Sequence, residues 1–369
     1  MTRSILRSTA FAALVACSLA ASAQSINESV AKAPAPAGSQ TLYGVIDLSV
    51  RGGRGEPAAG TLSGPSTPNQ TNMVSGGLRP SRLGFRGSED LGSGSRAFYQ
   101  LEAGFDAASG AGAMGAGVMF NRESHVGIAS GSHAISMGRT YNEAYRSLSQ
   151  FDPIGFVAQN VNPNAIAGSL SDFGTFGNNG GLGSRNLSSA VRYQGDFGPL
   201  GVSAQNSFGS AAAAGSRSSQ GVSASYDFAQ VSVGGSASRL RDAGISTLEA
   251  WTAGGTWHAT ENLNVSATYA RQNVDGGALN GFGRRVGSLG ATYAPGRVSY
   301  GLAYYGTRSN GAALDGDQAK VVGVTTYRLA PRTALYGELD FARNRGSYVV
   351  PGATTTRPYG LGVGVSHTF

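Results

Sequence analysis

Arginine is the residue type in this chain that is best able to act through its charge. It accounts for all but two of the 28 basic residues, the exceptions being Lys32 and Lys320. A guanidinium stays charged, presents a planar fork of donors and tolerates partial desolvation, so it suits a polar interior wall. The arginines are spread along the chain instead of clustered, and the formal charge of +7 therefore does not lead us to predict a nucleic-acid partner.

Arg82 and Arg86 stand out from the other arginines because of their spacing. They alternate with Leu83 and Phe85, so in a strand both would point to the polar face, opposite the two apolar side chains. A single arginine elsewhere in the chain is as well explained by a solvated rim or a contact with lipid headgroups. These two are the first candidates for a charged wall.

Enzyme chemistry finds little support in the sequence. The histidines have neither a serine elbow nor an acidic pair beside them, and their spacing does not fit a metal site; they are His125, His133, His258 and His367. The Gly-rich stretch 174–183 lacks the strand-to-helix context of a phosphate cradle. We predict no catalytic residues, no metal and no cofactor, and keep an outer-membrane barrel enzyme only as the less favoured alternative.

The N-terminus has the pattern of a secretory signal. Arg3 and Arg7 precede a short apolar core at 11–16, and Ala21-Ser22-Ala23 forms a small-residue cleavage site, so we expect residues 1–23 to be removed. In the alternative interpretation Cys17, the only cysteine, is the lipid-attachment residue of a lipoprotein. Residues 24–39 are rich in Ala, Pro, Ser and Gly and are expected to form a disordered leader.

Residues 40–369 predict an all-β domain, a transmembrane antiparallel β-barrel. Segments of roughly ten residues alternate between apolar and small or polar side chains; in one of them Ala97, Tyr99 and Leu101 alternate with Arg96, Gln100 and Glu102. A soluble sandwich would show the same alternation. Tight breaks at 89–92, 195–200, 295–296 and 330–332 alternate with longer polar stretches, and aromatic residues lie near segment ends (Trp251, Trp257, Tyr269, Tyr293 and Tyr327), which favours a membrane barrel.

The segments number about sixteen strands, and a barrel of that size encloses an aqueous channel. An adhesin with a narrow, closed barrel is the competing class. The stretch 142–186 is the longest without alternation, yet it carries four phenylalanines. A loop this long is usually functional, and we expect it to fold into the lumen as the third loop and to narrow it.

Four stretches of the chain resemble the general trimeric porins of β-proteobacteria, the family found in Neisseria, Bordetella and Burkholderia relatives. They are 41–47 (TLYGVID), 81–92 (SRLGFRGSEDLG), 327–336 (YRLAPRTALY) and 365–369 (VSHTF). The resemblance implies a sixteen-stranded barrel, a homotrimer in outer-membrane lipid and lipopolysaccharide, an inward third loop, and passive permeation of small hydrophilic solutes and ions with a weak preference for anions.

The resemblance also implies a constriction in which arginines face acids on the third loop. The residues that match are Arg82, Arg86, Arg139, Glu143, Asp152 and Asp172. Arg139 shares the apolar parity of Ile135 and Met137, so it reaches the pore only if Gly138 introduces a bulge or the strand has already ended. The terminal Phe369 is expected to be the assembly signal of the barrel.

Overall fold

The computed structural model describes residues 38–54, 70–112, 119–158, 161–164, 185–208, 217–242, 246–277, 280–311, 315–348 and 355–369. The predicted signal 1–23 and almost all of the predicted leader lie outside these residues. The strands are β1 (Ser39–Arg54), β2 (Gln70–Ser75), β3 (Arg82–Gly92), β4 (Ser95–Gly104), β5 (Glu123–Ser130), β6 (His133–Tyr141), β7 (Asn186–Phe197), β8 (Leu200–Ser207), β9 (Arg217–Asp227), β10 (Val231–Asp242), β11 (Ser246–His258), β12 (Leu263–Gly276), β13 (Gly283–Tyr293), β14 (Val298–Asn310), β15 (Gly316–Ala330), β16 (Thr333–Gly346) and β17 (Tyr359–Thr368), and the helix α3 is Glu143–Phe151.

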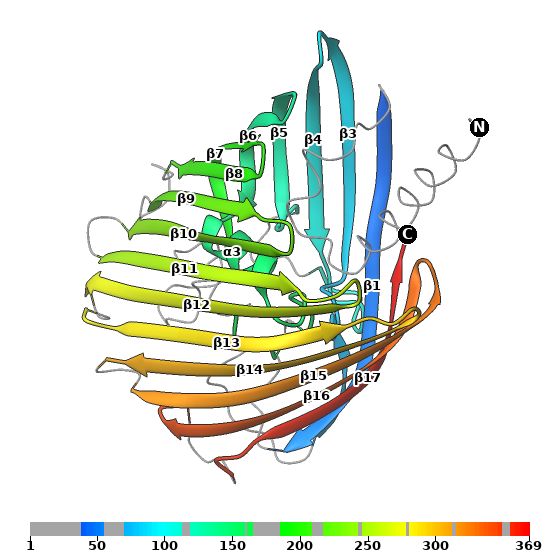
Figure 1. Ribbon diagram of the computed structural model, residues 1–369, viewed down its shortest axis with the longest axis vertical. Helices are drawn as coiled ribbons and strands as arrows, with labels where there is room; N and C mark the ends of the chain where they lie inside the picture. Colours follow the sequence, from blue (N-terminus) through cyan, green and yellow to red (C-terminus); the bar gives the residue numbers. More distant parts are fainter. Residues whose placement is uncertain are drawn as a thin grey trace, which may run out of the picture.

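The strands form one closed antiparallel barrel (Figure 1). Each strand from β3 onward pairs with the next, and β17 returns to pair with β1 through the register Val45↔Thr368 to Arg54↔Tyr359. β2 and β3 both pair with β1, on successive stretches of it, and therefore occupy a single position in the wall. The seventeen strands thus fill sixteen positions, which confirms the predicted barrel.

The two faces of the wall differ as the alternation predicts. On β16, Leu339 and Phe341 are 40% and 57% exposed on the outside, whereas Glu338 and Asp340 are 3% and 0% exposed on the inside. An apolar outer surface of this extent is stable only against lipid. The predicted aromatic residues near segment ends, from Trp251 to Tyr327, are all exposed on this outer face. Among the described helical residues, none forms a helix with the length and hydropathy needed to cross a bilayer.

Short turns and longer connections alternate around the barrel. The first short turn, however, is at Ser93 and Gly94, beyond the predicted 89–92, which lies within β3. Ser93 and Gly94 both have positive φ, 53° and 75°, and this conformation suits a tight hairpin. The predicted turn 295–296 lies between β13 and β14. The predicted 195–200 and 330–332 contain the turns at 198–199 and 331–332 but overlap the ends of the strands, and the longer connections lie at the opposite rim.

The wall is broken between β2 and β3, a feature that the alternation does not predict. Residues 76–81 leave the ladder, and Asp47 of β1 accepts hydrogen bonds from the backbone N–H groups of Leu78 (3.2 Å) and Arg79 (3.1 Å). The hydroxyl of Tyr336 donates to the same carboxylate at 2.7 Å. Asp47 therefore supplies the acceptors that the interrupted strand would otherwise lack.

Candidate functional site

Helix α3 opens the third loop and lies on the inner face of the barrel, behind β10 and β11 in Figure 1. Asn142 caps it, accepting a hydrogen bond from the backbone N–H of Tyr145. Phe151, at its end, packs on Gly254 and Gly234, where a Cβ atom would come within 2.7 Å and 2.9 Å of the Phe151 side chain. The glycines of the wall thus make room for the helix inside the barrel.

Glu143 anchors the start of the helix to the wall. Its carboxylate accepts hydrogen bonds from Arg192 Nε (2.7 Å), Ser203 Oγ (2.6 Å) and Ser223 Oγ (3.0 Å). Burial by itself raises the pKa of Glu143, but the charge of Arg192 and these donors outweigh it and hold the pKa below its usual range. Glu143 therefore stays ionised in a site from which water is excluded.

Arg146 makes the second anchor of the helix. Its Nη2 atom donates to Glu123 Oε1 (3.2 Å) and Thr140 Oγ1 (2.6 Å). Together with Glu143 and Arg192 it forms what we call the anchor cluster: Glu123, Glu143, Arg146 and Arg192, with two acids and two arginines. All four are buried and the formal charges cancel.

Asp152 organises the turn that follows the helix. One carboxylate oxygen accepts from the backbone N–H groups of Ile154 (3.1 Å) and Phe156 (2.9 Å), and the other from the side chains of Asn162 and Asn164. Asn164 also donates to Thr268 (2.9 Å) of β12. Burial raises the pKa of Asp152 and the hydrogen bonds oppose that rise. The Asp152 carboxylate therefore holds the loop in place through hydrogen bonds within the protein.

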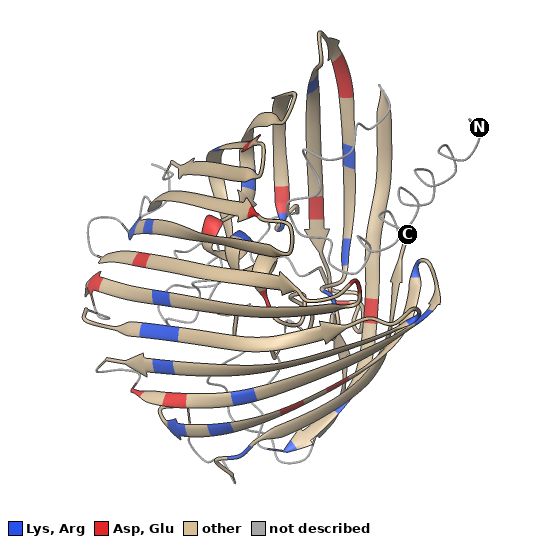
Figure 2. Cartoon of the chain, in the orientation of Figure 1, with Lys and Arg blue, Asp and Glu red and all other residues tan. Residues whose placement is uncertain are grey.

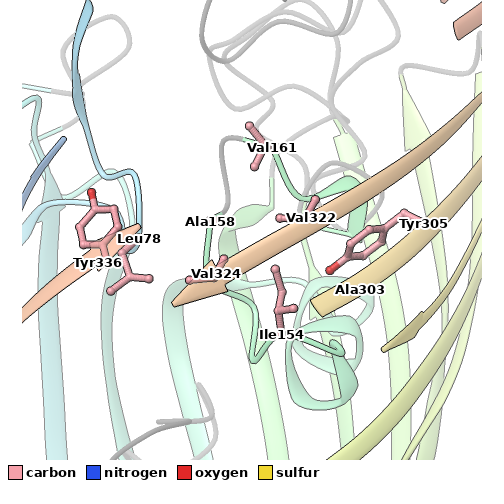
Figure 3. Close-up of a cluster of buried hydrophobic side chains, with 9 residues drawn as sticks. All are labelled: Leu78, Ile154, Ala158, Val161, Ala303, Tyr305, Val322, Val324 and Tyr336. Carbon is pink, nitrogen blue, oxygen red and sulfur yellow. The ribbon is translucent and has the colours of Figure 1, made fainter. Parts of the chain in front are cut away.

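The loop then reaches the opposite part of the wall. The backbone N–H of Ala158 donates to the carbonyl of Leu78 (3.0 Å), in the break between β2 and β3. An apolar cluster surrounds this contact (Figure 3): Leu78, Ile154, Ala158, Val161, Ala303, Tyr305, Val322, Val324 and Tyr336. The described residues 143–158 therefore reach from the wall at β10 and β11 to the break, and buried apolar contacts hold both ends.

Arg82 and Arg86 lie on the inner face of β3, as their parity predicts. Arg82 Nε is 3.5 Å from the Glu102 carboxylate of β4, which Arg122 also contacts at 2.5 Å. Arg86 lies over the ring of Tyr43, 5.1 Å from its centroid, and the Tyr43 hydroxyl donates to Glu102 at 2.9 Å. We call Arg82, Arg86, Arg122 and Glu102 the pore arginine cluster, in which three arginines lie around one carboxylate. It adjoins the anchor cluster, because Glu102 pairs in register with Glu123.

A further inward group joins β1, β15 and β16. Arg51 pairs with Glu338 at 2.9 Å and with Asp340, and Lys320 pairs with Asp340 at 3.0 Å. Two cations meet two acids, so the formal charges cancel. The polar parity of Glu338 and Asp340 could have pointed to this group, but their partner Arg51 lies at the other end of the chain.

The other predicted site residues are placed differently. Arg139 pairs in register with Ser124, on the outward parity of Val126 (60% exposed), and its guanidinium binds the carbonyl of Asn121 and Ser188. The ladder does shift register between Gly138 and Thr140, but this irregularity leaves Arg139 on the outer side. Asp172 lies outside the described residues. Glu143 and Asp152 are buried anchors and do not face the pore arginine cluster.

The remaining predicted residue is Phe369, and two of the histidines also make contacts within the wall. Phe369 exchanges two backbone hydrogen bonds with Gly44 of β1, each of 3.2 Å, and its ring lies over that glycine, so the terminal residue extends the seam that closes the barrel. His133 and His367 contact Tyr193 and Thr333 respectively. No group of three or more metal-binding side chains occurs in the part of the chain that the structure describes.

Comparison with known proteins agrees with this architecture. A family model described as Gram-negative porin matches residues 10–347. The chain belongs to the Gram-negative porin family. Its membership and its closed barrel confirm the expectation of an outer-membrane channel protein that the four sequence stretches raised.

Individual porins share parts or nearly all of the chain. An outer membrane porin protein of Bordetella pertussis is 33% identical over 127 residues, about a third of each chain (32%). Outer membrane porin protein 32 of Delftia acidovorans is 26% identical over 368 residues, covering 90% of this chain and 94% of its own. Among solved structures, the anion-selective porin from Comamonas acidovorans superposes with a TM-score of 0.75 at 20% identity, covering 90% of this porin and 99% of its own chain. The trimer form of OmpT, an outer membrane protein of Vibrio cholerae, superposes with a TM-score of 0.64 at 14% identity, covering 90% of this chain and 100% of its own.

Proposed function

We propose that this porin is a passive channel for small hydrophilic solutes and ions with a weak preference for anions. Sixteen strand positions leave room for water within a barrel, and the third loop narrows that space from one side. The observation that supports the preference is the excess of positive charge in the pore arginine cluster, where Arg82, Arg86 and Arg122 lie around Glu102.

The anchor cluster and the group around Arg51 are balanced, so they add little net field. Arg86 is exposed and Arg82 keeps 21% of its side chain exposed, so both remain accessible to passing ions. Arginines that line a constriction lower the barrier for anions and raise it for cations.

The test is the reversal potential in a planar bilayer under a potassium chloride gradient. The wild-type channel is expected to show ohmic steps with weak anion preference, and Arg82→Glu should shift the reversal potential toward cations, since it changes the local charge by two while keeping most of the conductance. Arg241→Glu makes the same change on the outer face of β10 and serves as the control. Strong cation preference of the wild type, or equal potentials for wild type and Arg82→Glu, would contradict the proposal.

We also propose that the porin is exported by a signal peptide at 1–23, assembles into a homotrimer in outer-membrane lipid, and uses Phe369 as its assembly signal. The trimer form of OmpT, an outer membrane protein of Vibrio cholerae with a similar fold, supports trimerisation. Chemical cross-linking of the purified protein in detergent would give a three-chain band, and a single-chain band alone would contradict this assembly.

A further inference from the structure

A row of arginines crosses the outer wall near the rim with the long connections. The register pairs Arg271 with Arg285, Arg285 with Arg308, Arg308 with Asp317, and Asp317 with Arg345. We call Arg271, Arg285, Arg308 and Arg345 the outer arginine row. Figure 2 shows their blue bands following one another across β12, β13, β14 and β16.

The outer arginine row is electrostatically unfavourable by itself. Side chains directly opposite on neighbouring strands lie about 5 Å apart at Cβ, and like charges in such pairs repel. Arg308 is relieved by Asp317 (2.7 Å) and Asp315 (3.2 Å), and Asp317 also approaches Arg345 (3.9 Å). Arg285, between two other arginines, has no carboxylate at ion-pair distance among the described residues. The row therefore holds more positive charge than the neighbouring acids neutralise.

A groove of about 450 Å³ lies directly beside the row on the same face. The next row of the register is Tyr269, Gly287, Gly306, Ala319 and Arg343, so three small residues separate a tyrosine from a fifth arginine. A Cβ atom on Gly287 would meet no atom within 4 Å. The missing side chains thus form the floor of a depression, which Arg285, Arg308, Arg343 and Arg345 border.

The groove lies near the rim of the barrel, between charged side chains and an exposed apolar belt. Arg285 and Arg308 are each two residues from the ends of their strands at the rim. On the other side of the floor, the register continues with Leu289, Tyr304 and Phe341, which are 58%, 52% and 57% exposed. Charged side chains toward the rim and an apolar belt below them match an amphipathic ligand.

We propose that this groove binds the phosphorylated headgroup of an outer-leaflet lipid. Phosphate oxygens accept hydrogen bonds from Arg285, Arg308 and Arg343, and the fork of each guanidinium suits such an oxyanion. The acyl chains lie over Leu289 and Tyr304. The groove faces the lipid side of the wall, so a membrane lipid is its occupant and a free solute anion is not. The site is separate from the pore arginine cluster and does not depend on ion selectivity.

The experiment measures lipid binding to the purified porin in detergent by native mass spectrometry. The probes are a bisphosphorylated, acylated glucosamine disaccharide and the same lipid without its phosphates, with inorganic phosphate as competitor. Replacing both Arg285 and Arg308 by Ala should weaken binding of the phosphorylated lipid at least about tenfold. Gly287→Leu should weaken lipid binding as well, because the leucine side chain fills the floor of the groove while every charge is kept.

Arg241→Ala removes an outer arginine that does not line the groove and should leave the affinity within about twofold of wild type, a change of roughly 0.4 kcal/mol. Circular dichroism confirms that each variant is folded. Equal binding of the lipid without phosphates, displacement of the lipid by inorganic phosphate at comparable concentration, or wild-type affinity of both the double variant and Gly287→Leu would overturn the proposal. Arg82→Glu should bind the lipid normally, so a failed selectivity test leaves this inference standing.

Discussion

Two adjoining charged clusters inside the barrel use the same residue types for different roles. On the side that α3 covers, Arg146 and Arg192 are matched by Glu123 and Glu143, and all four are buried. Around β3 and β4, Arg82 and Arg122 share Glu102, and Arg86 lies over Tyr43 and is exposed. Charge balance with burial holds a loop in place, whereas charge excess with exposure acts on ions. Residue type alone does not distinguish the two roles.

Removing the anchor acid should give the largest effect. Glu143→Ala leaves Arg192 buried without its carboxylate, which costs about 3–5 kcal/mol in a buried pair. We expect a lower thermal unfolding midpoint and a larger single-channel conductance, because α3 is no longer fixed to the wall. Glu249→Ala is the control, since its pair with Arg239 is exposed on the outer face and contributes about 0–1 kcal/mol. Unchanged stability and conductance in Glu143→Ala would refute the anchoring role.

The far end of the loop can be tested at the break in the wall. Asp47→Ala removes the acceptor for Leu78, Arg79 and Tyr336, and hydrogen bonds to a charged group contribute about 1.5–3 kcal/mol. The expected result is faster proteolysis within residues 76–81 together with reduced stability in denaturant. Asp275→Ala, an exposed acid at the rim, should behave like wild type; equal proteolysis of the two variants would show that Asp47 does not hold the break.

The glycine that seats the helix offers a smaller, steric test. In Gly254→Ala the new Cβ lies 2.7 Å from the Phe151 Cβ, and overpacking of this kind costs about 1–3 kcal/mol. The helix should shift toward the lumen and lower the single-channel conductance. Gly337→Ala places its Cβ at an ordinary 3.4 Å from Thr325 and should leave conductance unchanged. An identical conductance for both variants would mean that α3 does not rest on Gly254.

The smallest change in side-chain size is made by Glu102→Gln, which is expected to act on selectivity. The amide keeps an acceptor for Arg122 while the excess positive charge of the cluster rises by one, so the reversal potential should move further toward anions. Glu249→Gln makes the same charge change on the outer face. If Glu102→Gln shifted the potential no more than this control, the pore arginine cluster would not set the selectivity.

Much of the fold could be predicted because it depends on the two-residue alternation of side chains along each strand. The inward direction of Arg82 and Arg86 and the outward direction of Trp251 follow from alternation with their immediate neighbours. The same rule placed Arg139 on the apolar side, where it lies. The sequence left open whether a bulge at Gly138 would bring Arg139 into the pore, and the shift in the β6–β7 ladder leaves its side chain on the outward parity.

The sequence by itself determined the barrel, its two faces and the parity of each strand. The tertiary structure decided which inward charges are neutralised, since Arg51 meets Glu338 across 287 positions of the chain and Arg192 meets Glu143 across 49. It also decided that β2 and β3 are interrupted where the third loop docks. Side-chain direction is set by neighbours along one strand, but ion pairing depends on closure, register and the path of a loop, and these are fixed only when distant segments come together.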